Sequence, residues 1–442
     1  MSLQAAASGS RRWWVAGLLT ACFSLSYIDR QVVSILVAPI KAALNLSDTK
    51  VGLLQGLSFS LIYVAASLPL ARIADRGNRT RLIGMSIAVW SVMTMLCGFA
   101  RSFPLLLAAR MGVAGGEAGL PPAALTMMAD MFTPRDLVRA TAVFNLAPFI
   151  GGGVALLAGG SLYALTAHWA MPHVPFFGTP QRWQFMFLMV GAPGLILAAV
   201  VASIRDAERR RAPGGKGNPF SDMLLFVRGN PVVVSFYMLS IALVAMLLNS
   251  YIAWFPSSMI RSQGMDERAV GLAFGPVFLA SGALGTLFGG LVIGRMQDKV
   301  VERTFKYMRM SMCILLPIAI VAPMLPLLSL ELPAVGAALF LVSSILGLSS
   351  IPLQYIAPPH LRAQAIALIS IFSALLGIGM GPVVVGMLSD VLPFKTHSLS
   401  WALAIVGTVV VPTVIVMMSV VIRAHRSRVR HEAAAVATSL AS

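Results

Sequence analysis

The sequence predicts an all-α membrane protein whose twelve transmembrane helices form two pseudo-symmetric six-helix bundles. Three observations lead to this fold class: an apolar composition, twelve apolar segments of spanning length, and a repeat that relates the two halves of the chain. Of the 442 residues, 58% are hydrophobic and 11% are charged, and the mean hydropathy is +0.84. Soluble domains carry about 25% charged residues, so lipid must cover most of this chain.

Each predicted span approaches or exceeds the roughly 20 apolar residues that a helix needs to cross a bilayer. The apolar run that follows Arg11 and Arg12 is too long for a signal peptide and lacks a clear cleavage site, so it is expected to be the first span. The predicted spans are residues 13–40, 51–73, 82–100, 103–129, 139–165, 184–204, 231–255, 269–294, 308–329, 334–357, 363–390 and 399–422.

The basic residues are divided unequally between the two sides of these spans. With the N-terminus inside, 24 of the 33 Lys and Arg residues fall inside and 7 fall outside, while Arg30 and Arg110 lie within spans. This asymmetry follows the positive-inside rule and predicts a multi-pass inner-membrane protein with both termini in the cytoplasm. The net charge of +17 then faces anionic lipid, so no nucleic-acid partner is expected.

A polar segment at residues 205–230 separates the first six spans from the last six. It predicts a cytoplasmic linker between an N-terminal bundle (1–204) and a C-terminal bundle with a basic tail (231–442). The halves share short motifs in the same order and orientation. Arg139-Ala140-Thr141-Ala142, for example, corresponds to Arg362-Ala363-Gln364-Ala365. Such a parallel repeat is typical of carriers that bind substrate between two bundles.

Four charged residues lie inside the first and fourth spans: Asp29, Arg30, Arg110 and Glu117. Each costs about 2.5–3.5 kcal/mol at a helix centre, so they are expected to face a cavity or one another. Arg110 and Glu117 are seven residues apart and share a helix face.

The four residues differ in whether they can release a proton, and this difference assigns them different roles. Arginine does not release its proton in a protein, so Glu117 and Asp29 are the candidate proton-coupling residues. Arg30 and Arg110 are candidate counter-charges or ligands for a phosphate or carboxylate. The alternative is a static salt-bridge cluster that only sets helix packing.

Other candidate residues lie along the pathway and at its inner end. Asn145 and Tyr63 could bind substrate, although a polar residue in a span more often makes an interhelical hydrogen bond. Asp75, Arg76 and Arg79 follow the second span and are expected to form an inner gate latch with Arg139. The alternative is that these charges are a solvated topology signal.

The loop Ala71–Arg79 resembles the G-x-x-x-D-R-x-x-R pattern of the major facilitator superfamily, with Ala71 in place of the first Gly, and a degenerate copy lies at 294–299. Residues 25–150 are similar to spinster-like carriers in Tyr27-Ile28-Asp29-Arg30-Gln31, Ser47-Asp48, and the stretch from Arg110 to Glu117. This resemblance implies the major facilitator fold, alternating access, a lysophospholipid or sphingoid phosphate as substrate, and proton coupling.

The sequence thus favours a secondary active transporter, acting as a monomer, for an amphipathic organic anion. The alternative is a proton-driven multidrug or small-metabolite antiporter of the same fold. A channel is disfavoured because the asymmetric charge cluster and the two-bundle repeat favour alternating access over an open pore, and an intramembrane lipid enzyme is also disfavoured. The spans contain no nucleophile–His–Asp set, metal-ligand spacing or phosphate-binding loop, so no enzyme activity, metal or cofactor is expected.

Overall fold

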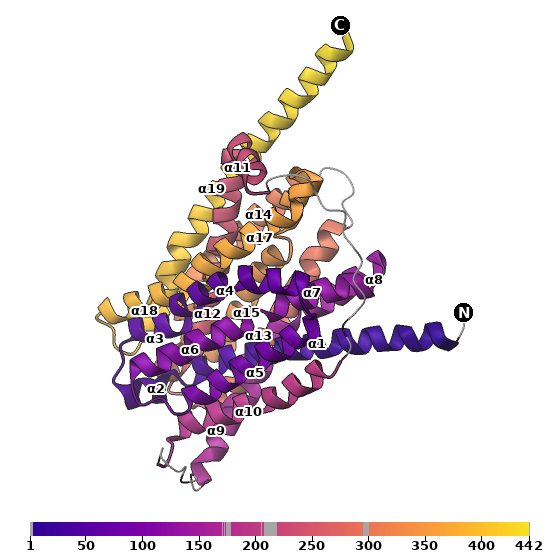
Figure 1. The fold of residues 1–442 in the computed structure, drawn as a ribbon. Coiled ribbons are helices and arrows are strands. Elements are labelled where there is room, and N and C mark those ends of the chain that lie inside the picture. Colours follow the sequence, from indigo (N-terminus) through magenta and orange to yellow (C-terminus); the bar gives the residue numbers. More distant parts are fainter. Residues whose placement is uncertain are drawn as a thin grey trace. The chain divides into compact units, whose positions relative to one another are not determined.

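The computed structural model describes residues 3–169, 171, 173, 178–204, 206, 219–294 and 300–441. Half of the predicted linker (205 and 207–218) and most of the degenerate loop copy (295–299) lie outside the described residues. The described chain is built from helices, which confirms the predicted all-α fold class (Figure 1).

The helices of the first six predicted spans are α1 (Leu3–Ile35), α2 (Val37–Leu44), α3 (Asp48–Gln55), α4 (Leu57–Arg76), α5 (Arg79–Cys97), α6 (Phe103–Glu117), α7 (Leu120–Met131), α8 (Pro134–Phe144), α9 (Ala147–Leu165) and α10 (Arg182–Ala202). The later helices are α11 (Pro219–Gly229), α12 (Pro231–Gln263), α13 (Glu267–Gly294), α14 (Val300–Val321), α15 (Leu328–Gly347), α16 (Ile351–Ile356), α17 (Arg362–Phe372), the π-helix η4 (Ser373–Met380), α18 (Gly381–Val391) and α19 (Ser398–Ala441).

Ten helical stretches among the described residues are long and apolar enough to cross a membrane, and the pair α1 and α2, bent by 61°, is an eleventh. The predicted fourth span corresponds to α6 and α7, which follow each other across Ala118 and Gly119. Each of these two helices is shorter than one membrane crossing, and together they cover the predicted segment. This arrangement agrees with the twelve spans that the hydropathy predicts.

Short polar residues begin several helices. Ser47 Oγ accepts a hydrogen bond from the Lys50 amide at the start of α3 (3.2 Å), and Asn78 Oδ1 accepts one from the Arg81 amide at the start of α5 (2.9 Å). Such caps satisfy amides that have no partner within the helix. They place Asp48 and Arg79 in the first turns of their helices.

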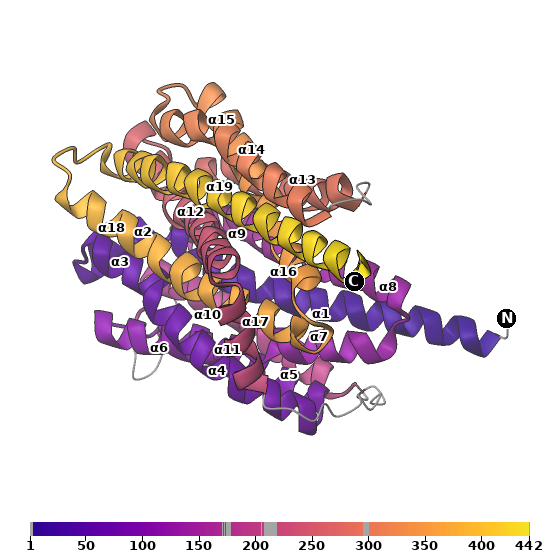
Figure 2. The same cartoon turned by 90° about the horizontal axis from the view of Figure 1, so that it is seen from above.

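The chain divides into two compact units, each assembled from segments that are distant in the sequence. The first consists of Met1–Ala212, Ile252–Ala280 and Pro382–Leu399, and the second of Pro213–Tyr251, Ser281–Gly381 and Ser400–Ser442. In the first unit, α1 packs against α9, and α5 packs against both α6 and α10. In the second unit, α14 packs against α15, and the two lie side by side in Figure 2. The last turns of α12, the first half of α13, and α18 therefore belong with the N-terminal helices.

Candidate functional site

The four intramembrane charges lie together in the first unit. Asp29 and Arg30 come from α1, and Arg110 and Glu117 come from α6. The side chains of Asp29, Arg110 and Glu117 are almost completely buried, at 1%, 1% and 2% exposure. Gly116 lets α6 pack closely against α5, because a Cβ at that position would lie 2.7 Å from the backbone nitrogen of Trp90. We call Asp29, Arg30, Arg110 and Glu117 the four-charge cluster.

One strong ion pair joins α1 to α6 within this cluster. The Arg30 Nε donates to Glu117 Oε2 at 2.6 Å, and a second guanidinium nitrogen lies 2.5 Å from the same oxygen. The other carboxylate oxygen, Glu117 Oε1, is buried and accepts no hydrogen bond from the described residues. Glu117 therefore has one oxygen committed to Arg30 and one oxygen available to a proton or a donor.

Asp29 and Arg110 are held more loosely. Thr94 Oγ1 on α5 donates to Asp29 Oδ2 at 2.9 Å, and an Arg110 guanidinium nitrogen reaches the Asp29 backbone carbonyl at 3.4 Å. Among the described residues, Asp29 Oδ1 and Arg110 Nε are buried without a hydrogen-bond partner. Buried polar atoms without partners are costly and rare in folded proteins. Their presence in the cluster indicates a site that is not saturated by the protein itself.

Aromatic rings surround the Arg30 guanidinium. Its Cζ lies 4.8 Å from the ring centroid of Tyr27, 4.5 Å from that of Phe59 and 5.1 Å from that of Tyr63. The Phe59 ring also lies 5.5 Å from the Arg110 Cζ. Cation–π attraction strengthens when the cation is desolvated. The aromatic rings therefore stabilise the positive charge on Arg30 in the low-dielectric interior of the unit.

A second charged group lies where α3 begins. The Asp48 carboxylate accepts two hydrogen bonds of 2.6 Å from the Arg261 guanidinium on α12 and one of 2.8 Å from Ser389 Oγ on α18, and it pairs with Lys41 on α2. Asp390 in turn accepts hydrogen bonds from the backbone amides of Asp48 (2.9 Å) and Thr49 (2.8 Å). We call Lys41, Asp48, Arg261, Ser389 and Asp390 the Asp48 cluster.

Two glycines let the helices of the Asp48 cluster approach closely. A Cβ on Gly52 of α3 would lie 2.5 Å from the Pro382 carbonyl oxygen, and a Cβ on Gly386 of α18 would lie 2.5 Å from the Asp48 carbonyl oxygen. A larger residue at either position would push α3 and α18 apart. The ion pairs of Asp48 and the close backbone packing at these glycines therefore both hold the first part of α3 in place.

The predicted latch residues have different environments. Arg79 is 2% exposed and donates to Asp130 Oδ2 (2.5 Å) and Asp206 Oδ1 (3.0 Å), which joins the start of α5 to the end of α7 and to the chain after α10. Asp75 and Arg76 are exposed at the end of α4. Arg139 is exposed and lies 3.8 Å from Asp136 on its own helix.

The structure brings together five of the six predicted coupling and binding residues: the four charges and Tyr63. Asn145 is exposed at the end of α8. Sequence reasoning missed Thr94, Phe59 and the partners of Asp48. Phe59 and Tyr63 are four residues apart on α4, a spacing that places both on one helix face and could have indicated an aromatic wall. The partners of Asp48 on α12 and α18 lie more than 200 residues away and leave no local signal.

Among the described residues, no group of three or more His, Cys, Asp or Glu side chains could hold a metal ion. The two clusters instead contain arginine–carboxylate pairs. A guanidinium fork suits the geometry of carboxylates and phosphates.

Comparisons with known proteins agree with this architecture. The family model described as Major Facilitator Superfamily matches residues 19–382. The chain is 31% identical over 403 residues to an MFS-type efflux pump of Mycolicibacterium smegmatis, with 86% of each protein covered. It is 26% identical to the sphingosine-1-phosphate transporter SPNS2 of Danio rerio, with 85% of this chain and 75% of the relative covered.

A solved structure provides the same fold at lower identity. A bacterial homolog of the human lysosomal transporter spinster, in an inward-facing and unoccupied conformation, matches with a TM-score of 0.77 and 24% identity over 95% of this chain and 98% of that chain. The extent of the family match and the similarity to spinster relatives lead to one conclusion. The chain belongs to the major facilitator superfamily of membrane transporters and resembles its spinster-like branch.

Proposed function

We propose that this protein is a proton-coupled secondary active transporter that moves an amphipathic organic anion, such as a lysophospholipid or sphingoid phosphate, by alternating access. The observation that carries the proposal is the buried Arg30–Glu117 pair, in which one carboxylate oxygen is bound to the guanidinium and the other is left without a donor among the described residues.

The charges of the four-charge cluster suggest how a proton and an anion bind together. Asp29 and Glu117 balance Arg30 and Arg110, so the cluster is neutral when both carboxyls are ionised. Protonation of Glu117 removes one negative charge and weakens its hold on Arg30. The guanidinium then has a free fork for a phosphate or carboxylate. A bound proton therefore raises the affinity for the anion, and by linkage the anion raises the affinity for the proton.

The aromatic wall suits the same substrate class. Tyr27, Phe59 and Tyr63 lie against the Arg30 guanidinium and would contact the apolar part of a substrate whose charged head binds there. One relative supports this class by name, the sphingosine-1-phosphate transporter SPNS2 of Danio rerio. We carry this substrate class to the present chain as a proposal.

We assign the two remaining groups of charges to gating. The Asp48 cluster closes the end of the pathway where α3 begins, which the distribution of basic residues places outside, and it breaks when that end opens. Arg79 fixes the inner ends of α5 and α7, so that Asp75, Arg76 and Arg139 are presented as the inner latch. We also propose that the linker 205–230 separates the two bundles and that a single chain forms the transport unit. In this proposal the protein lies in the inner membrane, and both termini are in the cytoplasm.

The test is uptake of a labelled lysophospholipid into proteoliposomes with an imposed pH gradient. The wild type should accumulate lipid when the gradient is present. Glu117→Gln should still exchange lipid at equal pH but should show no response to the gradient, because an amide cannot gain or lose the coupling proton. Asp136→Asn removes an exposed carboxylate from the same half and should retain the response. Gradient-driven uptake by Glu117→Gln would exclude Glu117 as the coupling residue.

A second candidate function rests on one observation, the 31% identity to an MFS-type efflux pump over 86% of both chains. In this alternative the protein exchanges protons for a drug or small metabolite. The same vesicles separate the two functions, because lysophospholipid would then neither be transported nor compete with a transported amphipathic drug.

A further inference from the structure

A cavity of about 590 Å³ lies in the second unit, whereas the four-charge cluster and the Asp48 cluster belong to the first. Its volume falls within the roughly 300–1,000 Å³ typical of small-molecule sites. The first turn of α14, the short helix α16 and the end of α19 form its walls. The lining residues are Val300, Val301, Glu302, Tyr355, His425, Arg426, Val429 and Arg430.

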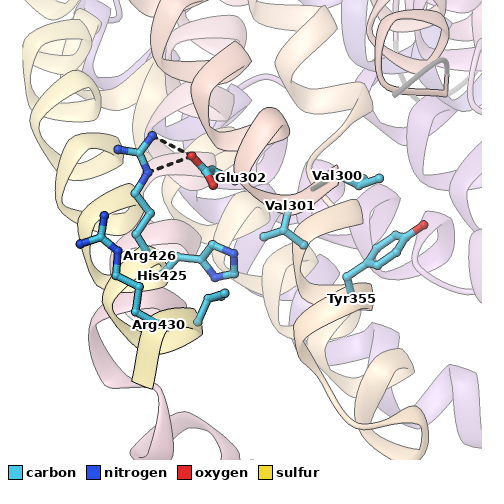
Figure 3. A pocket seen from close by; sticks show the side chains of 8 residues that line it. Val300, Val301, Glu302, Tyr355, His425, Arg426 and Arg430 are labelled. Atoms are coloured by element: carbon cyan, nitrogen blue, oxygen red, sulfur yellow. Dashed lines mark hydrogen bonds and ion pairs between the residues drawn. The ribbon is translucent and has the colours of Figure 1, made fainter. Parts of the chain in front are cut away.

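The cavity has a charged side and an apolar side. In Figure 3, His425, Arg426 and Arg430 extend from α19 along one wall, and Val300, Val301 and Tyr355 lie on the other. The Arg426 guanidinium donates to Glu302 Oε1 at 2.8 Å and has a second nitrogen 2.7 Å from the same oxygen. Lys306 also pairs with that oxygen, at 2.9 Å. Two cations therefore already neutralise the single carboxylate of this cavity.

Arg430 remains as an additional cation. It lines the cavity, and it has no ion-pair partner among the residues that the structure describes. Arg426, Lys306 and Arg430 are positively charged, and Glu302 is negatively charged. The side chains around the cavity therefore carry a net charge of about two positive units. The N-terminal end of the α14 dipole adds positive potential, because Val300 and Val301 form its first turn.

The position of the cavity along the helices matches the headgroup layer of a bilayer. A helix crosses the hydrocarbon core in about 20 residues, and α19 starts at Ser398, so Arg426 and Arg430 lie beyond the core. At the other wall, α14 begins at Val300, whereas the predicted ninth span begins at residue 308. Both walls therefore lie beyond the predicted spans, on the side of the bilayer where the charged headgroups are.

We propose that this cavity binds the phosphate of an anionic phospholipid, with Arg430 and Arg426 holding the headgroup and the valines contacting the apolar part of the lipid next to it. Basic pockets between membrane helices on the cytoplasmic side bind anionic headgroups in this way. The cavity belongs to a different unit from the four-charge cluster, and the proposed ligand is a bilayer lipid that stays bound rather than a transported substrate.

The test is native mass spectrometry of the full-length protein released from nanodiscs that contain equal amounts of phosphatidylglycerol and phosphatidylcholine. The wild type should retain phosphatidylglycerol in preference to phosphatidylcholine. Arg430→Gln should lower the bound phosphatidylglycerol about fivefold, because one basic residue near an anionic surface contributes about that factor. Glu302→Gln should raise it, because the carboxylate competes with the phosphate for Arg426.

Arg428→Gln is the matched control. Arg428 is two residues from Arg430 on α19, so it lies on another face of the helix, and it does not line the cavity. Its substitution removes the same charge and should leave lipid retention unchanged. Thermal unfolding in phosphatidylcholine alone shows whether each variant is folded, so a loss of lipid can be separated from a loss of structure.

Three results would overturn the proposal. Equal losses in Arg428→Gln and Arg430→Gln would mean that diffuse charge attracts the lipid and that the cavity does not. Equal retention of the two lipids by the wild type would exclude a headgroup site. Stabilisation of the protein by inorganic phosphate in phosphatidylcholine nanodiscs, without retention of phosphatidylglycerol, would identify a soluble anion as the ligand.

Discussion

The four-charge cluster and the Asp48 cluster both hold buried carboxylates next to arginine, yet they differ in how completely those carboxylates are paired. Asp48 has hydrogen bonds or ion pairs on both oxygens, from Arg261, Lys41 and Ser389. Asp29 and Glu117 each have one buried oxygen without a donor among the described residues. A saturated carboxylate holds helices together, whereas an unsaturated one is ready to take a proton or to release its partner.

Arg79 is a further buried arginine that can be compared with these two clusters. Arg79 is as buried as Arg110, but it is held by Asp130 and Asp206 through a side-chain contact to each and by a backbone amide hydrogen bond to Asp206. It resembles the Asp48 cluster in its saturation, although sequence reasoning grouped it with the latch. Burial alone therefore does not distinguish the residues that we propose for transport from Arg79, whereas the buried atoms without partners in the four-charge cluster do.

The largest expected effect comes from breaking the saturated Arg79 site. Arg79→Ala removes the guanidinium that contacts both Asp130 and Asp206, and loss of one partner of a buried ion pair costs about 3–5 kcal/mol. We expect a clear drop in the thermal unfolding temperature in detergent, measured by tryptophan fluorescence. Arg76→Ala, at an exposed position three residues away, is the control. A normal unfolding temperature for Arg79→Ala would contradict the structural role.

The next largest effect is expected when the Arg30–Glu117 ion pair of the four-charge cluster is broken. Arg30→Gln leaves Glu117 buried without its cation, and Glu117 can relieve this cost by taking up a proton. We therefore expect a smaller loss of stability than in Arg79→Ala but a complete loss of gradient-driven transport. In Arg30→Gln/Glu117→Gln the stability should return and the transport should not. An additive loss of stability in the double variant would mean that the two residues do not interact.

A moderate effect should follow from loosening the Asp48 cluster. Asp48→Asn weakens the attraction to Arg261 and Lys41 and keeps the shape of the side chain. The end of the pathway that we propose this cluster closes should therefore open more often. Ser398, which is 3% exposed and hydrogen-bonded to Ser389, reports this opening when it is replaced by Cys in a Cys313→Ser background. Labelling by a membrane-impermeant maleimide should accelerate about tenfold for each 1.4 kcal/mol lost. An unchanged labelling rate would exclude Asp48 from the gate.

The smallest effect is expected at Arg139. Its side chain is 62% exposed and lies 3.8 Å from Asp136, and exposed pairs of this kind contribute about 0–1 kcal/mol. Arg139→Gln should leave the unfolding temperature unchanged. If the inner latch forms during the cycle, the same variant should alter the rate of lipid exchange, measured at equal pH on both sides. No change in either measurement would remove Arg139 from the latch.

The comparison of the clusters also shows which parts of the site could be predicted. The cost of placing Asp29, Arg30, Arg110 and Glu117 in spans predicted that they would meet, and the spacing of Arg110 and Glu117 placed both on one face of the fourth span. The sequence did not reveal that Arg30, rather than Arg110, pairs with Glu117. That choice depends on how α1 and α6 are rotated relative to each other, which helix packing decides.

The amino-acid sequence by itself determined the all-α membrane fold, because apolar segments of spanning length have no other stable state in lipid. It also identified the superfamily and the residues of the four-charge cluster. The tertiary structure alone decided which charges are saturated. Asp48 meets Arg261, Ser389 and Asp390 from helices more than 200 residues away, and such contacts arise from how helices pack, which local sequence patterns do not encode.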